Sequence, residues 1–151
     1  MEGIVQLVTM PWGAWRGNRD LFLNFPKDWE IILVSMADGR NLSQAEMRGA
    51  FANPLGQEPI RRLAEGKKTA VIAVYDLTRP TQAHRFLPFI VDDLNKSGIK
   101  NENIKIDLAM GCHRALMKKD QEKKIGKKMA NRFPIKTGWI GDYLPGNPRS
   151  D

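Results

Sequence analysis

Two short motifs hold the side chains of this chain that are best suited to chemistry. They are residues 76–80, which read DLTRP, and residues 111–114, which read GCHR. An arginine such as Arg79 carries a planar fork of donors that matches a carboxylate or a phosphate. A histidine such as His113 can take or give a proton under neutral conditions. The two motifs therefore predict a site that holds an anionic group and moves a proton.

Other residues of the two motifs could support these side chains. Asp76 could orient a histidine or an arginine by accepting hydrogen bonds, and Gly111 permits a positive φ beside the site. Simpler interpretations stay open, because an Asp-x-x-Arg pair is often a structural salt bridge and a histidine beside an arginine is often a surface residue. Cys112 follows an apolar run and is interpreted as a packed small residue rather than a nucleophile.

The elements around the motifs predict that both lie at one edge of a sheet. Residues 69–75 are almost all apolar, as in a strand covered on both faces, and residues 104–110 form a second predicted strand. Residues 81–97 between them have helical spacing, with Pro88 adjusting the first turn or kinking the helix. Ligands of open α/β sheets bind outside the carboxyl ends of the strands, where both motifs begin. The expected fold class is α/β, with an open, parallel, Rossmann-like sheet.

The segments before this unit predict a small antiparallel β unit followed by two helices. Residues 4–8, 20–24 and 29–34 are interpreted as its strands. Ser43 and Glu46 form a capping box for a helix that ends near Asn53, because Pro54 follows. A short helix is expected between Pro59 and Gly66. The expected domains are residues 1–135 and an irregular tail, 136–151, which is rich in glycine and proline.

The composition indicates a globular protein and excludes a membrane-spanning or disulfide-rich one. The chain has 151 residues, 42% hydrophobic and 27% charged, which suits one globular domain. No apolar run approaches the roughly 18 residues of a membrane span, and a single cysteine excludes an internal disulfide and a cysteine-cluster metal site. We expect a cytoplasmic protein without a membrane partner.

The net charge of +7 is a local feature. Residues 96–136 hold 12 Lys and Arg against 4 Asp and Glu, and six of these basic residues lie within residues 118–128. This pattern indicates the solvated face of a surface helix. Aromatic residues are not interleaved with these lysines, so the sequence predicts no nucleic-acid partner.

In their order and spacing, the two motifs resemble the N-terminal domain of the nickel-pincer lactate racemase family. Agreement extends to residues 10–13 (MPWG), 53–56 (NPLG) and 63–67 (LAEGK), and the resemblance covers roughly residues 5–134. It implies a two-domain enzyme that uses a nickel pincer nucleotide, with the active site between the domains. The implied substrate is a 2-hydroxy acid, of which lactate is one example.

The resemblance also implies a role for each motif residue. Arg79 would hold the substrate carboxylate, His113 would act as acid and base on the 2-hydroxyl, and Asp76 would support this pair. The residues that would face the cofactor are Thr78, Gly111 and Arg114. Ala115 departs from the proline that commonly follows the His-Arg pair in the family.

The rest of the active site belongs to parts of the family enzymes that are absent from these 151 residues. Those parts supply a second catalytic histidine, a covalent lysine and the nickel-ligating histidine, whereas this chain has only His84 and His113. We therefore expect no metal site here, no tight binding of the nickel pincer nucleotide, and no catalysis without the missing C-terminal domain or a partner chain.

Two other functions remain compatible with the sequence. The chain could be a non-catalytic binding module that uses Arg79 and His113 to hold a phosphate- or carboxylate-bearing small molecule. It could also be an oligomerising structural domain, with a homo-oligomer as its product and both motifs serving as salt bridges.

Overall fold

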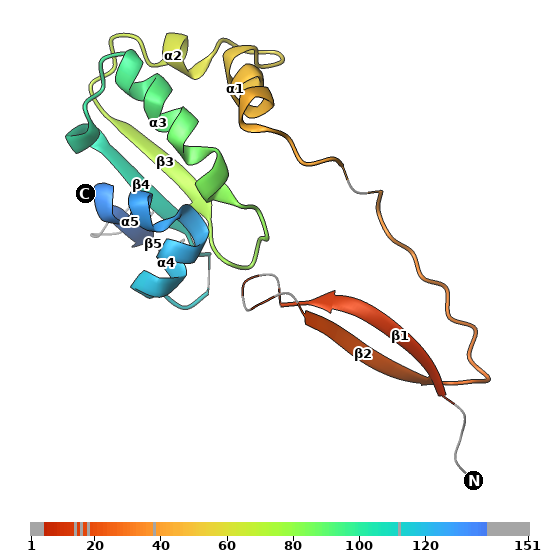
Figure 1. Cartoon of the computed structure of the whole chain (residues 1–151). Coiled ribbons are helices and arrows are strands. Elements are labelled where there is room, and N and C mark those ends of the chain that lie inside the picture. Colours follow the sequence, from red (N-terminus) through yellow and green to blue (C-terminus); the bar gives the residue numbers. More distant parts are fainter. Residues whose placement is uncertain are drawn as a thin grey trace. The chain divides into compact units, whose positions relative to one another are not determined.

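The chain folds into two compact units, residues 1–41 and residues 42–151 (Figure 1). The structure is a computed structural model that describes residues 5–13, 15, 17, 19–37, 39–111 and 113–138. Cys112 and residues 139–151, most of the predicted irregular tail, lie outside the described residues.

The first unit is built on an antiparallel hairpin of β1 (Val5–Trp12) and β2 (Arg19–Pro26). This confirms the small antiparallel β unit. The third predicted strand, residues 29–34, is wrong, because residues 30–37 have no regular secondary structure. Ile32 and Val34 are 76% and 89% exposed. An apolar, β-branched run favours an extended chain, but a strand also needs a neighbour to pair with.

The second unit is a parallel sheet with helices packed on it. Its elements in chain order are α1 (Gln44–Ala52), α2 (Ile60–Leu63), β3 (Ala70–Tyr75), the 3-10 turn η1 (Ala83–Arg85), α3 (Leu87–Lys96), the 3-10 turn η2 (Asn101–Asn103), β4 (Ile104–Ala109), α4 (Lys118–Ile125), α5 (Lys127–Arg132) and β5 (Ile135–Gly138). The strands are parallel, in the order β3-β4-β5. The predicted α/β class with a parallel sheet is confirmed.

The third strand of this sheet corrects the predicted boundary of the tail. Residues 136–138 were expected to be irregular but belong to β5, in which Ile135 pairs with Ile106 of β4. The β5 strand is only four residues long and leads into a segment rich in glycine and proline, so its sequence carries little strand signal.

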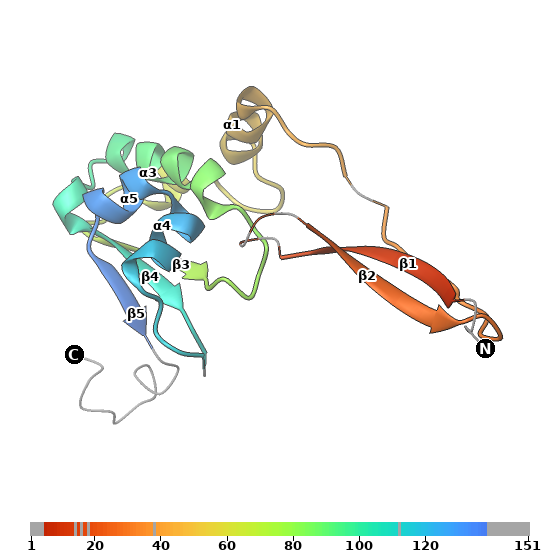
Figure 2. The same ribbon diagram turned by 60° about the horizontal axis from the view of Figure 1, so that its bottom comes forward.

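The helices α3, α4 and α5 cover one face of the sheet (Figures 1 and 2). On that face Ile104, Ile106 and Leu108 are fully buried. On the other face Val71 and Tyr75 are 67% and 64% exposed. The expectation that β3 would be covered on both faces is therefore wrong for this chain. Among the described residues, helices pack against only one face of β3, although its residues are almost all apolar.

Short-range sequence patterns correctly predicted where α1 begins and ends and how α3 accommodates its proline. Ser43 Oγ accepts a hydrogen bond from the Glu46 amide at 3.2 Å, and Glu46 Oε2 accepts one from the Ser43 amide at 2.8 Å, so the capping box is confirmed. Asn53 caps the end of α1, as predicted. Pro88 lies in the first turn of α3, where its missing amide donor costs little.

The lysine-rich segment forms two helices rather than one. Gly126, with φ of +85°, separates α4 from α5. Most of its lysines are exposed, but Lys124 is fully buried, which contradicts a purely solvated face. Within the described residues, no helix is both long and apolar enough to cross a membrane.

Candidate active site

The sheet brings the two motifs together as the sequence predicted. Tyr75 at the end of β3 pairs with Ala109 at the end of β4, so the loops that follow begin side by side. Asp76 is the first residue after β3, and His113 follows β4 by four residues. Their side chains meet although 37 positions separate them in the sequence.

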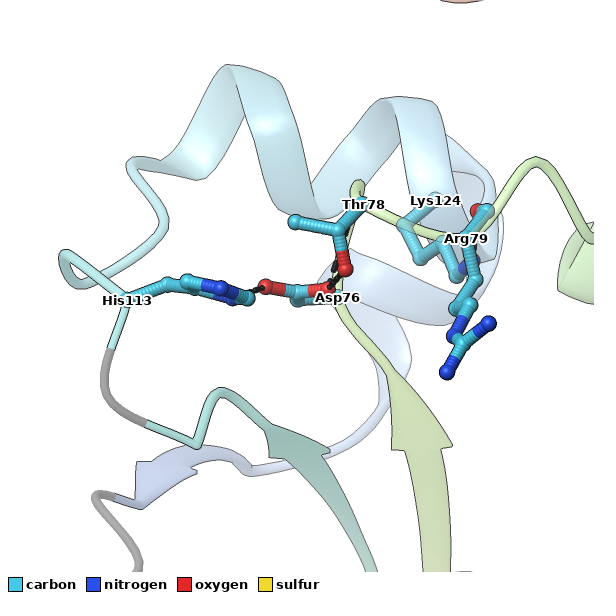
Figure 3. A network of polar contacts seen from close by, with 5 residues as sticks. All are labelled: Asp76, Thr78, Arg79, His113 and Lys124. Atoms are coloured by element: carbon cyan, nitrogen blue, oxygen red, sulfur yellow. Dashed lines mark hydrogen bonds and ion pairs between the residues drawn. The ribbon is translucent and has the colours of Figure 1, made fainter.

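Asp76 is the centre of this site. Its side chain is buried, with 5% of the residue exposed. One carboxylate oxygen accepts hydrogen bonds from the Thr78 amide at 3.0 Å and from the Thr78 hydroxyl at 2.5 Å. The other oxygen lies 2.5 Å from Nδ1 of His113 (Figure 3). Three contacts therefore fix the orientation of one carboxylate.

These contacts keep Asp76 ionised. Burial by itself raises the pKa of Asp76, but hydrogen bonds from Thr78 and His113 outweigh it and hold the pKa below its ordinary value of 3.8. An ionised carboxylate can only accept hydrogen bonds, so Nδ1 of His113 must be the donor. In the neutral imidazole this leaves Nε2 without a proton, which is the form a general base needs.

His113 is half exposed, with 50% of its side chain accessible. Its backbone amide donates to the Met110 carbonyl at 3.0 Å, which closes a tight turn after β4. Gly111 has φ of +58° in this turn, a conformation that favours glycine, and a Cβ there would meet nothing within 4 Å. The turn thus places His113 beside Asp76, with half of the His113 side chain accessible.

Arg79 lies on the opposite side of Asp76 from His113 (Figure 3). It is exposed, and its guanidinium carbon lies 6.0 Å from the centre of the Tyr75 ring. In the part of the chain that the structure describes, no carboxylate pairs with this guanidinium. Arg79 therefore offers its donors to a ligand, whereas the Asp76–His113 pair is already formed.

Two of the three residues predicted to face the cofactor, Thr78 and Arg114, contact other residues of the chain. The Thr78 amide and hydroxyl both donate to Asp76. The guanidinium of Arg114 lies 3.7 Å from Asp120, on the first turn of α4. The structure thus gives Thr78 a role in orienting Asp76, and contacts from Thr78, Gly111 and Arg114 to a cofactor stay a prediction.

One residue of the site was missed by the sequence reasoning. The fully buried Lys124 donates a hydrogen bond from Nζ to the Arg79 carbonyl at 2.8 Å. It sits in a run of lysines whose other members are mostly exposed, so its burial has no sequence signal beyond the adjacent apolar Ile125.

The site has few side chains that could bind a metal ion. Across residues 5–138, leaving aside the few undescribed positions, no three or more His, Cys, Asp and Glu side chains gather closely enough to hold a metal ion. Asp76 and His113 meet as a pair that is joined by its own hydrogen bond.

Comparisons with known proteins identify relatives of this chain. The profile of a family described as the lactate racemase N-terminal domain matches residues 17–138. A lactate racemase of Thermoanaerobacterium thermosaccharolyticum is 36% identical over 101 residues, which are 65% of this chain and 24% of that protein. A lactate racemase of Lactiplantibacillus plantarum is 31% identical over 92 residues, 61% of this chain and 22% of that protein.

A solved structure agrees with the fold. The lactate racemase apoprotein from Thermoanaerobacterium thermosaccharolyticum matches with a TM-score of 0.63 and 28% identity, over 87% of this chain and 30% of that one. The chain spans about a quarter of the length of the curated relatives it matches. Because the family profile covers residues 17–138, well over half of the sequence, the chain belongs to the lactate racemase N-terminal domain family.

Proposed function

We propose that this chain supplies the substrate-binding part of the active site of a racemase that acts on lactate or a related 2-hydroxy acid. The observation that carries the proposal is the Asp76–His113 pair, which lies beside an exposed arginine at the carboxyl edge of the sheet. Membership of the lactate racemase N-terminal domain family supports the same reaction class.

Each side chain has a defined task in this proposal. A 2-hydroxy acid carries a carboxylate and a hydroxyl on neighbouring carbons. The planar fork of Arg79 binds the carboxylate and so orients the substrate. His113 accepts the hydroxyl proton at Nε2 and returns it at the end of the reaction. Asp76 holds the ring and stabilises the imidazolium that forms in between, as the carboxylate of a catalytic triad does.

The nickel pincer nucleotide implied by the resemblance does not fit the described residues of this chain as a complete site. Nickel needs several nitrogen, oxygen or sulfur donors around one point, and no such group is present among the described side chains. Both Thr78 donors are directed to Asp76. We assign no step to the cofactor, and its ligands are proposed to come from the C-terminal domain of the enzyme or from a partner chain. The chain alone is then expected to bind substrate weakly and to be inactive.

The cytoplasm is the proposed location. Oxidising compartments favour paired cysteines, and this chain has a single one.

A second function is favoured by one specific observation. The Arg79 guanidinium is exposed and has no carboxylate partner among the described residues, so it could hold any carboxylate or phosphate. A binding module of this kind would need only the anionic group of its ligand. The racemase proposal requires the hydroxyl as well, and this difference separates the two functions.

Titration of the full 151-residue chain with three ligands tests the proposal. Lactate carries both groups, propionate lacks the hydroxyl, and inorganic phosphate is the competing anion. Amide signals are followed by ¹H–¹⁵N NMR in the wild type, in Arg79→Ala, and in the control Arg62→Ala, which removes an exposed arginine that pairs with Glu65 just after α2.

The racemase proposal predicts that lactate shifts the signals of both Arg79 and His113, whereas propionate shifts those of Arg79 alone. One added hydrogen bond of about 1 kcal/mol makes lactate bind about fivefold more tightly than propionate. Arg79→Ala abolishes both responses and Arg62→Ala keeps them. Equal responses to lactate, propionate and phosphate would instead assign the chain to the binding module.

A further inference from the structure

Lys124 is an unusual residue for the helix that carries it. It lies on α4 among exposed lysines, yet none of its surface is accessible. Its Nζ donates to the carbonyl oxygen of Arg79 at 2.8 Å, across 45 positions of sequence (Figure 3). A buried ammonium is costly unless opposite charge and hydrogen bonds compensate for its lost hydration. What compensates Lys124 therefore indicates what it does.

Part of the compensation comes from the loop that carries the candidate site, residues 76–79. Burial lowers the pKa of Lys124, and the facing charge of Asp76 opposes that shift. Asp76 itself faces His113 from the loop after β4 and Thr78 from its own loop. From η1, which packs on α4, His84 lies against Gly126. Of these groups, the carboxylate of Asp76 carries the full negative charge that matches the lysine.

The charge balance matters for an anionic ligand. The carboxylate of Asp76 lies between Arg79 and His113, where it repels a carboxylate that approaches either side chain (Figure 3). Lys124 is fully buried, so its positive charge reduces this repulsion from inside the fold. The hydrogen bond to the Arg79 carbonyl also fixes the backbone from which the guanidinium extends.

We propose that Lys124 is a positioning residue of the site, which holds the 76–79 loop through the Arg79 carbonyl and offsets the charge of Asp76 so that a carboxylate ligand can bind. This role rests on the proposed function, because it assigns Lys124 to the same ligand. Lys124 acts through Arg79 and Asp76 and does not itself touch the substrate.

Two substitutions separate the parts of this role. Lys124→Met removes the charge and the donor but keeps a long apolar side chain. Replacement of a buried ion by a hydrophobic residue is often tolerated, so this variant is expected to fold. Lys124→Gln removes the charge and keeps a donor. Lys123→Met is the matched control, because Lys123 is the exposed neighbour on the same helix.

The expected results differ among the three variants. Lys124→Met raises the pKa of Asp76, measured from its ¹³C carboxyl signal, and weakens lactate binding about tenfold through the lost charge-assisted bond. Lys124→Gln raises the pKa of Asp76 as well but keeps the amide shifts of the 76–79 loop near those of the wild type. Lys123→Met changes neither quantity. An unchanged Asp76 titration and unchanged lactate binding in a folded Lys124→Met chain would overturn the proposal.

A measurement on the wild type covers the case in which Lys124→Met does not fold. The Nζ protons of Lys124 should exchange with water far more slowly than those of Lys123, because Nζ is buried and hydrogen-bonded. Equal exchange would also overturn the proposal. The proposed function fails separately, if lactate shifts neither Arg79 nor His113 in the wild type while the Asp76 titration still responds to Lys124→Met.

Discussion

Asp76→Asn removes one charge from the site and leaves its shape nearly unchanged. The asparagine Oδ1 still accepts the two hydrogen bonds from Thr78, but its amide group faces Nδ1 of His113, where the carboxylate accepted a bond at 2.5 Å. A hydrogen bond to a charged group contributes about 1.5–3 kcal/mol. Half of the His113 side chain is accessible, so water replaces part of the lost bond. We expect the free energy of unfolding at neutral pH to fall by about 1–2 kcal/mol.

The assay is urea unfolding followed by far-ultraviolet circular dichroism. All helices of the described residues lie in the unit of residues 42–151, so this signal reports on the unit that carries Asp76. The expected loss lowers the urea midpoint by about 0.5–1 M. Glu102→Gln is the control, because Glu102 is 74% exposed and lies 4.0 Å from its partner Lys100.

Acid gives a second test of the same substitution. The pKa of Asp76 in the folded chain lies below 3.8, so its carboxylate contributes stability above pH 3.8 and loses it as the pH falls through the folded value. The wild type should therefore lose its advantage over Asp76→Asn in strong acid. Equal midpoints at neutral pH, or an advantage that persists below the folded pKa, would refute the assigned role of Asp76.

Substitutions at four further positions test the elements that position the site, all by urea unfolding. Leu108→Ala leaves a cavity at a fully buried position of β4 and should lower the free energy of unfolding by about 2–5 kcal/mol. Val71→Ala, on the exposed face of the sheet, should lower it by less than about 0.5 kcal/mol. Equal losses would contradict the assignment of the buried and exposed faces. Ser43→Ala breaks the capping box of α1 and should cost about 1 kcal/mol, and no loss would show that the cap does not stabilise the folded chain. A Cβ at Gly111 would meet no neighbour, but the residue has φ of +58°, so Gly111→Ala should lower the free energy of unfolding by about 1–2 kcal/mol. Gly111→Asn should lower it less, because asparagine tolerates this conformation better. A Gly111→Ala chain as stable as the wild type would contradict the left-handed turn.

The meeting of the two motifs could be predicted because it depends on sheet topology. Parallel strands end at one edge, so two polar motifs that follow such strands must begin near each other. The register of Tyr75 with Ala109 satisfies this condition. The capping box and the position of Pro88 were also predictable, since both depend on contacts within a few residues.

The burial of Lys124 could not be predicted in the same way. Lys124 lies in a run of mostly charged residues, and its hydrogen-bond acceptor, the Arg79 carbonyl, belongs to a loop 45 positions away. The strand predicted for residues 29–34 failed for a related reason, because its apolar pattern does not say whether a partner strand exists. The strand β5 was missed because its pairing with Ile106 is also long-range.

We expect an ionised Asp76 to hold His113 with Nδ1 protonated, so that Nε2 is left unprotonated and can accept a proton. A long-range ¹H–¹⁵N correlation spectrum of the neutral imidazole in the full chain tests this directly. The chain has two histidines, so His84→Gln assigns the signals. We expect the Nδ1–H tautomer of His113 in the wild type and its loss in Asp76→Asn. A wild-type His113 with the proton on Nε2 would contradict it.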